Sequence, residues 1–234
     1  AVNDVSFKIY EGETLGLVGE SGCGKSTLGN VILQLDKATA GKVFYHGRDI
    51  TKISTSELRK LRKEIQLIFQ DPFSSLNPRI PVGKAIMEPM EVHNLHKNNK
   101  ERKKKTLELL KRVGLDETHF NRYPHEFSGG QRQRIGIART IAVEPQLIVC
   151  DESVSALDIS VQAQVLNLLN ELKENFGFTY IFISHDLAVV KYMADQLLVM
   201  NQGKIVEQGD ADEIYAHPEK EYTQKLIDAI PKGI

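Results

Sequence analysis

Tryptophan is absent from this sequence of 234 residues, and cysteine occurs only twice. Cys23 and Cys150 form no C-x-x-C pair, which argues against a disulfide framework and against a cysteine-based zinc site. Long apolar runs are also lacking, since segments such as residues 147–150 and 180–183 are far too short to cross a bilayer. We therefore expect two reduced thiols, and we expect any connection to a membrane to run through partner proteins.

An excess of either charge is lacking as well. Thirty Lys and Arg side chains against 31 Asp and Glu give a formal net charge of −1. Since nucleic-acid binders usually carry a broad positive field, we expect no nucleic-acid partner. The lysine-rich run at residues 97–105 is interpreted as a solvated helix face rather than as a phosphate-binding patch. With 41% hydrophobic and 26% charged residues, the chain has the composition of an ordinary globular domain.

Short β-type runs alternate with longer amphipathic stretches, which is the pattern of an α/β fold with a mostly parallel sheet. The expected strands are residues 14–18, 65–69, 146–150, 179–183 and 196–200. Helices are expected at residues 25–35 and 161–175. The first seven residues read as a further strand, in an antiparallel β part at the N-terminus.

The character of the chain changes between about residues 72 and 144, where β-type runs stop. Apolar residues recur there at i, i+3 and i+4 in three stretches, residues 82–93, 100–113 and 130–143. We therefore expect residues 72–144 to form a helical subdomain. It would be inserted into an α/β core made of residues 1–71 and 145–234.

A glycine-rich stretch at residues 19–26 matches the pattern G-x-x-x-x-G-K-S/T in full, between an apolar strand and a helix. Its glycines allow backbone N–H groups to turn toward anionic oxygens, and the helix N-terminus adds its dipole. Lys25 is expected to reach the β- and γ-phosphates, and Ser26 to ligate Mg²⁺. The nucleotide-binding candidates are Gly19, Glu20, Ser21, Gly22, Cys23, Gly24, Lys25, Ser26 and Thr27. The motif predicts a nucleoside triphosphate but leaves a kinase, a GTPase, a helicase and a motor open.

Four polar side chains follow expected strands, at the point where each strand ends. Asp151 and Glu152 come directly after one apolar run, and Gln70 and His185 follow two others. Residues just beyond the carboxyl ends of strands line the ligand crevice of an open α/β sheet, so we expect all four around one nucleotide. Asp151 would complete a Mg²⁺ site, and Glu152 would polarise the attacking water.

Residues 127–134, Phe-Ser-Gly-Gly-Gln-Arg-Gln-Arg, go beyond general phosphate-loop logic. They resemble the signature motif of ABC ATPases, which usually begins Leu-Ser-Gly-Gly-Gln. Other motifs are similar to that family in order and spacing across essentially the whole chain. These are Gln70 as the Q-loop, Asp151 and Glu152 as Walker B, residues 155–158 as the D-loop, and residues 184–186 around the switch histidine.

The resemblance implies that ATP and Mg²⁺ are the cofactors and that two ATPase subunits sandwich two ATP molecules head to tail. Within it the catalytic residues are Lys25, Gln70, Glu152 and His185. The implied metal ligands are Ser26, Gln70 and Asp151. The resemblance also implies that the γ-phosphate bound by the opposite subunit lies against a helix start formed by Ser128, Gly129, Gly130 and Gln131. Asp158 is implied to take part in cross-talk between the two sites.

Finer similarity in residues 70–79, 122–127 and 222–227 points to the ATPases of oligopeptide, dipeptide and nickel importers. It implies a peripheral subunit on the cytoplasmic face of the plasma membrane, docked beneath two permeases, often beside a homologous second ATPase. An external binding protein would deliver the solute. As a hypothesis from position, the helical block from about residue 72 to 144 would receive the permease's cytoplasmic helix, and Gln70 would sense it.

Two departures from the family pattern stand out. Ser153 occupies a position where the family usually has proline, so the loop lacks a fixed φ but loses no reacting group. The adenine-stacking aromatic of the family would precede Ala1, and we expect a trimmed portion of a longer subunit, with residues 231–234 as a second abrupt end. A soluble ABC ATPase acting on nucleic acid or ribosomes stays an alternative, as does a regulatory module with a degenerate site.

Overall fold

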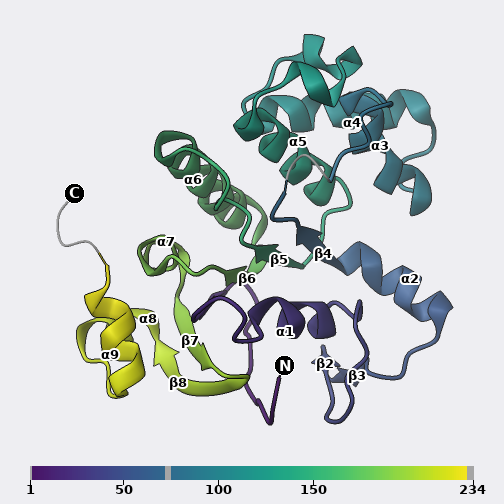
Figure 1. Ribbon diagram of the computed structural model, residues 1–234. Coiled ribbons are helices and arrows are strands. Elements are labelled where there is room, and N and C mark those ends of the chain that lie inside the picture. The colour runs from purple at the N-terminus through teal and green to yellow at the C-terminus, as the bar shows by residue number, and fades with distance from the viewer. Residues whose placement is uncertain (1, 72–74, 231–234) are drawn as a thin grey trace.

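The computed structural model of the chain describes residues 2–71 and 75–230. Its centre is a six-stranded sheet with the strand order β4-β5-β6-β1-β7-β8 (Figure 1). The strands are β1 (Thr14–Val18), β4 (Ile65–Ile68), β5 (Leu147–Asp151), β6 (Thr179–Ile183), β7 (Gln196–Asn201) and β8 (Lys204–Asp210). Neighbours run parallel from β4 to β7, and β8 is antiparallel to β7. A separate antiparallel hairpin joins β2 (Phe44–Tyr45) and β3 (Arg48–Asp49), so the expected α/β fold is confirmed.

Both faces of the sheet are covered, which explains why its central strands are apolar at nearly every position. In β6, Tyr180 and Phe182 enter one cluster of buried residues, whereas Ile181 and Ile183 enter another. This division follows from the two-residue period of side chains along a strand. The parallel strands therefore form a fixed centre from which the loops at their carboxyl ends project.

The opening segment differs from the expected strand. Among residues 2–13 no strand is assigned, and Asp4 has a positive φ of 52° that interrupts extended backbone. A strand needs a regular ladder of bonds to a neighbour, whereas this segment is tied by a bond from Asn3 N–H to the Gly203 carbonyl, at 2.7 Å. The prediction was wrong here because strand pairing depends on partners far away in the sequence. Ala1 and residues 231–234, at the expected trimmed ends, lie outside the described residues.

Helices occupy the stretches that the periodicity predicts, with ends shifted by a few residues. The helix after β1, α1 (Lys25–Ile32), stops earlier than expected because Gln34 adopts a positive φ of 54°, which a right-handed helix excludes. The helix after β5, α6 (Ile159–Phe176), begins earlier than expected. Further helices are α2 (Thr55–Glu64), α7 (Leu187–Met193), α8 (Ala211–Ala216) and α9 (Glu221–Asp228).

A block of helices lies between β4 and β5 in the sequence. It contains α3 (Val82–Val92), α4 (Asn99–Arg112), η1 (Glu117–Asn121), η2 (Pro124–Glu126) and α5 (Gly129–Ile141). Figure 1 shows these elements gathered beyond the β4 edge of the sheet, away from α1. Ile86, Leu110 and Ile135 are fully buried, in the same cluster as the side chains of one sheet face. The expected start of the block at Pro72, Phe73 and Ser74 lies outside the described residues, and the subdomain limits stay a prediction.

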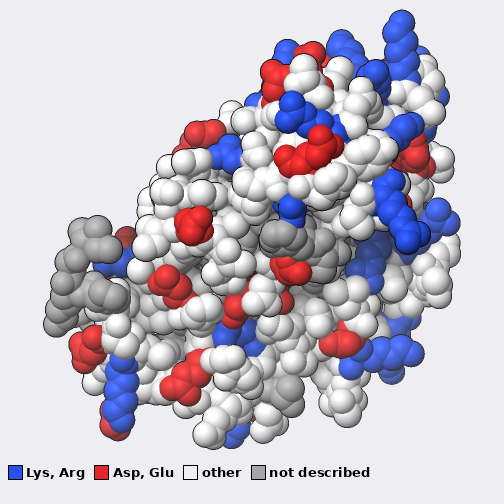
Figure 2. Space-filling view, turned by 45° about the horizontal axis from the view of Figure 1, so that its top comes forward, with Lys and Arg blue, Asp and Glu red and all other residues white. Residues whose placement is uncertain are grey.

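Lys and Arg side chains are frequent at the helical end of the molecule, at the upper right of Figure 2. Part of the lysine-rich run of α4 makes structural contacts. Lys105 Nζ lies 2.8 Å from the Glu144 carboxylate, and the Arg102 guanidinium donates to the Leu95 carbonyl at 2.9 Å. Two basic side chains of the run thus have partners in the protein, and the interpretation of the run as a solvated helix face stays a prediction. Within residues 2–71 and 75–230, every helix is too short or too polar to cross a membrane.

Candidate functional site

The loop between β1 and α1 is wrapped around the Lys25 side chain. Lys25 Nζ donates to the carbonyls of Gly19 at 2.7 Å and Glu20 at 3.0 Å, and the residue is only 5% exposed. Gly22 and Gly24 have positive φ values of 80° and 109°, which residues with a Cβ rarely adopt. The loop thus holds the ammonium group against its own backbone, beside the start of α1.

The same loop is pressed against β7 and the turn that follows it. A Cβ on Gly19 would lie 2.1 Å from the Met200 carbonyl oxygen, so only glycine fits there. Gly203 N–H donates to the Cys23 carbonyl at 2.9 Å, and the Cys23 thiol is buried. Burial makes a packing role the simpler interpretation of this cysteine. Of the other nucleotide-binding candidates, Ser21 and Gly22 are exposed and Thr27 is half-buried.

Two expected metal ligands lie side by side at the carboxyl ends of the strands. Ser26 Oγ, at the start of α1, donates to Asp151 Oδ1 at 3.0 Å. Burial raises the pKa of the Asp151 carboxyl, and the neighbouring Glu152 adds to this effect. The Ser26 hydrogen bond and the Lys25 charge act in the opposite direction. A cation bound here would relieve the cost of ionising Asp151.

Glu152 is the centre of a second cluster. Gln70 Nε2 donates to Glu152 Oε2 at 3.1 Å, and His185 Nδ1 lies 3.2 Å from Glu152 Oε1. These three side chains come from loops after β4, β5 and β6, which are adjacent in the sheet. The side chains of Gln70, Glu152 and His185 therefore meet at the carboxyl edge of the sheet, as the rule for strand ends predicts. Both oxygens of Glu152 have a partner that fixes the orientation of the carboxylate.

The backbone of Glu152 is also unusual. Its φ of 46° lies in the left-handed region, which non-glycine residues occupy at some cost in energy. Glu152 N–H donates to the Ile183 carbonyl at 2.9 Å, and the Ser155 hydroxyl donates to the Glu152 carbonyl at 2.9 Å. The next residue, Ser153, is buried at 1% exposure. The surrounding structure thus holds the carboxylate in place without the proline usual at that position in the family.

Ser128 caps the start of α5, and it forms a reciprocal pair of hydrogen bonds with Gln131. Gln131 N–H donates to Ser128 Oγ at 3.3 Å, and Ser128 N–H donates to Gln131 Oε1 at 3.0 Å. A Cβ on Gly130 would lie 2.2 Å from a Val161 methyl group, so α5 approaches α6 closely at this point. Helix α5 packs with α3, α4 and α6, whereas α1 packs against β5 and β6 (Figure 1). The start of α1 and the start of α5 therefore lie in different surroundings within one chain.

Comparison with known proteins explains why these motifs occur together. Residues 2–155 match the family described as "ABC transporter". The chain belongs to the ABC transporter family. It is 55% identical over 232 residues to the oligopeptide transport ATP-binding protein OppF of Bacillus subtilis (strain 168), in a match that covers 99% of this chain and 76% of that protein.

Other relatives of this ABC ATPase are also named as transport ATP-binding proteins. It is 51% identical over 233 residues to the dipeptide transport ATP-binding protein DppF of Lactococcus lactis subsp. cremoris (strain MG1363), covering 99% of this chain and 75% of that protein. Its fold is similar to that of the ATP-binding cassette MJ0796, in a dimeric structure of a post-hydrolysis state bound to ADP and Pi. The TM-score is 0.80 at 32% identity, and the match covers 90% of each chain.

A magnesium site in this ABC ATPase would rest on few protein ligands. Within residues 2–71 and 75–230, His, Cys, Asp and Glu form no cluster of three or more that would hold a metal. Mg²⁺ bound with nucleotides usually takes one or two protein oxygens, with phosphate and water oxygens completing the octahedron. The Ser26 hydroxyl and the Asp151 carboxylate, 3.0 Å apart, fit that requirement. Gln70, also expected as a ligand, donates to Glu152 through its Nε2, and its role as a metal ligand stays a prediction.

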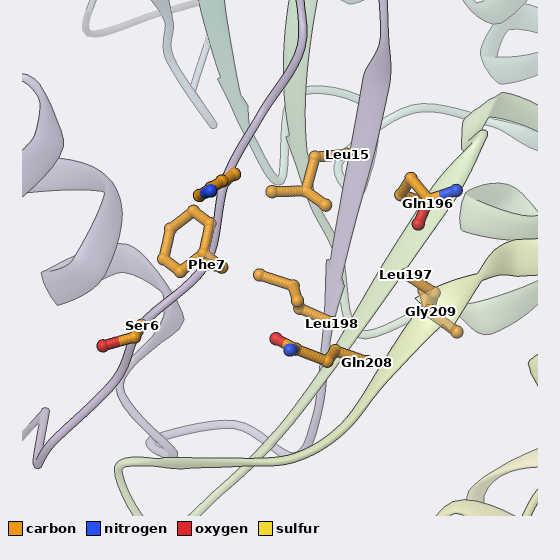
Figure 3. Close-up of a pocket in the computed structure, with 9 residues that line it drawn as sticks. Ser6, Phe7, Leu15, Gln196, Leu197, Leu198, Gln208 and Gly209 are labelled. Atoms are coloured by element: carbon orange, nitrogen blue, oxygen red, sulfur yellow. The ribbon is translucent and has the colours of Figure 1, made fainter. Parts of the chain in front are cut away.

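A hollow of about 450 Å³ lies elsewhere, between the opening segment and β1, β7 and β8 (Figure 3). Leu15, at the start of β1, and Gln196, at the start of β7, line it together with Phe7. It therefore opens at the amino ends of these strands, opposite the edge with Asp151. The nine residues that line it include no acid, histidine or cysteine, and Lys8 is the one titratable side chain among them.

One residue at the phosphate loop was not identified as part of the site from the sequence. The Tyr222 hydroxyl accepts a hydrogen bond from Glu20 N–H at 3.1 Å. The segment with Tyr222 was singled out only for its similarity to importer ATPases. Because 202 positions separate the two residues, no local pattern indicates that they meet.

Proposed function

We propose that this ABC ATPase powers a membrane importer for oligopeptides or dipeptides. The observation that carries the ATPase part is the convergence of Gln70 and His185 on Glu152, beside the Ser26–Asp151 pair. Similarity to proteins named for oligopeptide and dipeptide transport supports the solute class.

The proposed chemistry divides the work among a few side chains. Lys25 would leave the loop carbonyls and bind the β- and γ-phosphates, and Ser26 and Asp151 would hold Mg²⁺. The metal neutralises charge on the phosphate oxygens when it is bound. Glu152 accepts a proton from the attacking water, and Gln70 and His185 keep its carboxylate aimed at that water. His185 also has room to contact the γ-phosphate, since it is 55% exposed.

We further propose that two ATPase subunits close head to tail over ATP. The N-terminus of α5 has unpaired N–H groups in its first turn and a partial positive charge, which suit an anion. Ser128, Gly129, Gly130 and Gln131 would then meet the γ-phosphate bound to the loop of the opposite subunit. The dimeric cassette structures of a 32% identical relative support this arrangement.

Coupling to the membrane is assigned to the helical block. We place its limits at residues 72–144, with the core formed by residues 1–71 and 145–234. Gln70 ends a core strand next to Glu152 and immediately precedes the block, so it is positioned to transmit the presence of a γ-phosphate. Residues 74–79 would contact one of the two permeases at the cytoplasmic face of the plasma membrane; Ser74 lies outside the described residues. An external solute-binding protein would deliver the peptide to the permeases.

Reconstitution tests the proposed function. The chain would be purified from its native membrane with its associated subunits, placed in proteoliposomes, and supplied with a solute-binding protein and a labelled tripeptide. We expect ATP-dependent uptake that Glu152→Gln abolishes. Uptake of a different solute class would overturn the peptide assignment, and co-purification with ribosomes or nucleic acid in place of permeases would overturn the importer.

A further inference from the structure

The C-terminal helix α9 reaches the phosphate loop through one tyrosine. Tyr222, near the start of α9, accepts the hydrogen bond of Glu20 N–H on its hydroxyl oxygen at 3.1 Å. We propose that Tyr222 is a positioning residue that keeps the phosphate loop in its ATP-binding shape. The proposal rests on ATP being the ligand of this loop.

The peptide groups of Glu20 are held from two sides. Its carbonyl accepts from Lys25 Nζ at 3.0 Å and from Cys23 N–H at 3.3 Å, while its N–H donates to Tyr222. When ATP binds, the Lys25 ammonium turns to the phosphates and gives up the loop carbonyls. The Tyr222 bond uses the Glu20 N–H, whereas Lys25 holds the Glu20 carbonyl, so release of the lysine leaves the Tyr222 bond intact. It therefore persists while the lysine moves.

Helix α9 is itself firmly anchored, which allows it to position another segment. The Glu207 carboxylate, on β8, accepts from Glu219 N–H at 2.8 Å and from Lys220 N–H at 3.2 Å, just before α9 begins. An acid at a helix N-terminus is favourable because of the helix dipole and the unpaired amides there. Thr223, on the inner face of α9, is fully buried.

The environment of Tyr222 suits an acceptor that stays neutral. Leu226 and Ile227, later in α9, pack together with Tyr222 against the main hydrophobic cluster. Burial raises the pKa of the Tyr222 phenol above its ordinary value. A neutral, partly buried hydroxyl with a fixed ring has little rotational freedom to lose when it binds Glu20 N–H. A preorganised loop then needs less ordering when it closes on phosphate.

The direct test is Tyr222→Phe, which keeps the ring and removes the acceptor. Since a hydrogen bond of this kind is worth about 0.5–1.5 kcal/mol, we expect Kd and KM for Mg-ATP to rise about three- to tenfold, with kcat at saturating ATP unchanged. Inorganic tripolyphosphate, which has no base, should show the same rise in its inhibition constant. Tyr192→Phe is the matched control, since the Tyr192 hydroxyl bonds to Asn167 on α6 and should leave all constants unchanged.

A second variant tests the route through α9. Glu207→Ala removes the acceptor of two amides before α9 and should also raise KM for ATP. In the Tyr222→Phe background it should add nothing, because the tie to the loop is already lost. Additive effects in the double variant would overturn the assigned route.

Three outcomes separate this proposal from the ATPase assignment. Wild-type binding constants in Tyr222→Phe, with an active wild type, would overturn the role of Tyr222 and leave the ATPase intact. A lower melting temperature with an equal loss of kcat would show a general structural role and would also overturn it. Absence of ATP hydrolysis by the wild type with its partners would overturn the ATPase assignment instead.

Discussion

The two helix starts that we propose to meet phosphate, those of α1 and α5, are built differently. The N-cap of α1 is Gly24, which has no side chain and leaves the first amides of the helix free for a ligand. The N-cap of α5 is Ser128, whose hydroxyl accepts from Gln131 N–H in a complete capping box. Lys25 lies at the first of these starts, and an uncharged Gly129 at the second.

This difference indicates how the two segments would share one ATP in the proposed dimer. The α1 start combines open amides, a lysine and a magnesium ligand, so it is suited to bind triphosphate by itself. The α5 start is stable without any ligand, because the capping box pairs one of its amides internally. It is therefore suited to add contacts to a phosphate that is already bound. Among the variants below, Lys25→Ala changes the α1 start and Ser128→Ala changes the α5 start.

The largest effect is expected for Glu152→Gln, which leaves both helix starts intact. Loss of a general base lowers turnover by about 10²–10⁴-fold, while Mg-ATP still binds and dimers accumulate. Phosphate release and analytical ultracentrifugation with ATP measure the two effects. Glu144→Gln is the matched control, since Glu144 has a similar φ of 53° but lies outside the site. Wild-type turnover in Glu152→Gln would remove Glu152 from the mechanism.

Lys25→Ala breaks the α1 side. A hydrogen bond to a charged group contributes about 1.5–3 kcal/mol, so we expect Mg-ATP affinity to fall about 10- to 100-fold. Isothermal titration calorimetry on the monomer measures it. Lys105→Ala removes a lysine paired with Glu144 and should leave affinity unchanged. Equal affinity in wild type and Lys25→Ala would contradict the assignment of the phosphate loop.

Ser128→Ala breaks the α5 side. Loss of an N-cap costs about 1 kcal/mol of stability. Beyond this loss, we expect unchanged ATP affinity in the monomer but about fivefold less ATP-induced dimer, since hydrogen bonds to phosphate are charge-assisted. Ser54→Ala, which removes the equivalent capping box of α2, should cost similar stability and keep the dimer. If both variants dimerise equally, α5 does not face the partner's nucleotide.

The smallest effect concerns Asp151 in the nucleotide-free protein. Its folded-state pKa is raised, chiefly by burial, so the ionised form destabilises the fold at neutral pH, and this penalty disappears as pH falls through the folded-state pKa. Asp151→Asn should therefore raise the melting temperature by about 2 °C at pH 7 and by less at pH 4. Thermal scans at both values measure it. An equal gain at both would show that charge is not the cause.

The sequence predicted the parts of the fold that depend on local pattern. Residues 14–18 and 179–183 are β1 and β6 with the expected limits, because apolar β-branched runs between turns need no distant information. The prediction of a strand in the opening segment was wrong, because a strand exists only where a neighbour pairs with it. The meeting of Gln70 with Glu152 could be predicted from the rule for strand ends, whereas the contact of Tyr222 with Glu20 joins a helix to a loop, for which no comparable rule exists.

The contacts of the phosphate loop have a consequence for how this protein is made. The loop lies at residues 19–26, yet it is completed by Met200, Gly203 and Tyr222, which come at least 174 positions later in the sequence. A ribosome adds roughly 5–20 residues each second, so the loop waits many seconds for its neighbours. During that time the nascent chain has a nucleotide motif without the walls that shape it. We therefore expect nucleotide capture only after these three neighbours of the loop have been synthesised and have packed against it.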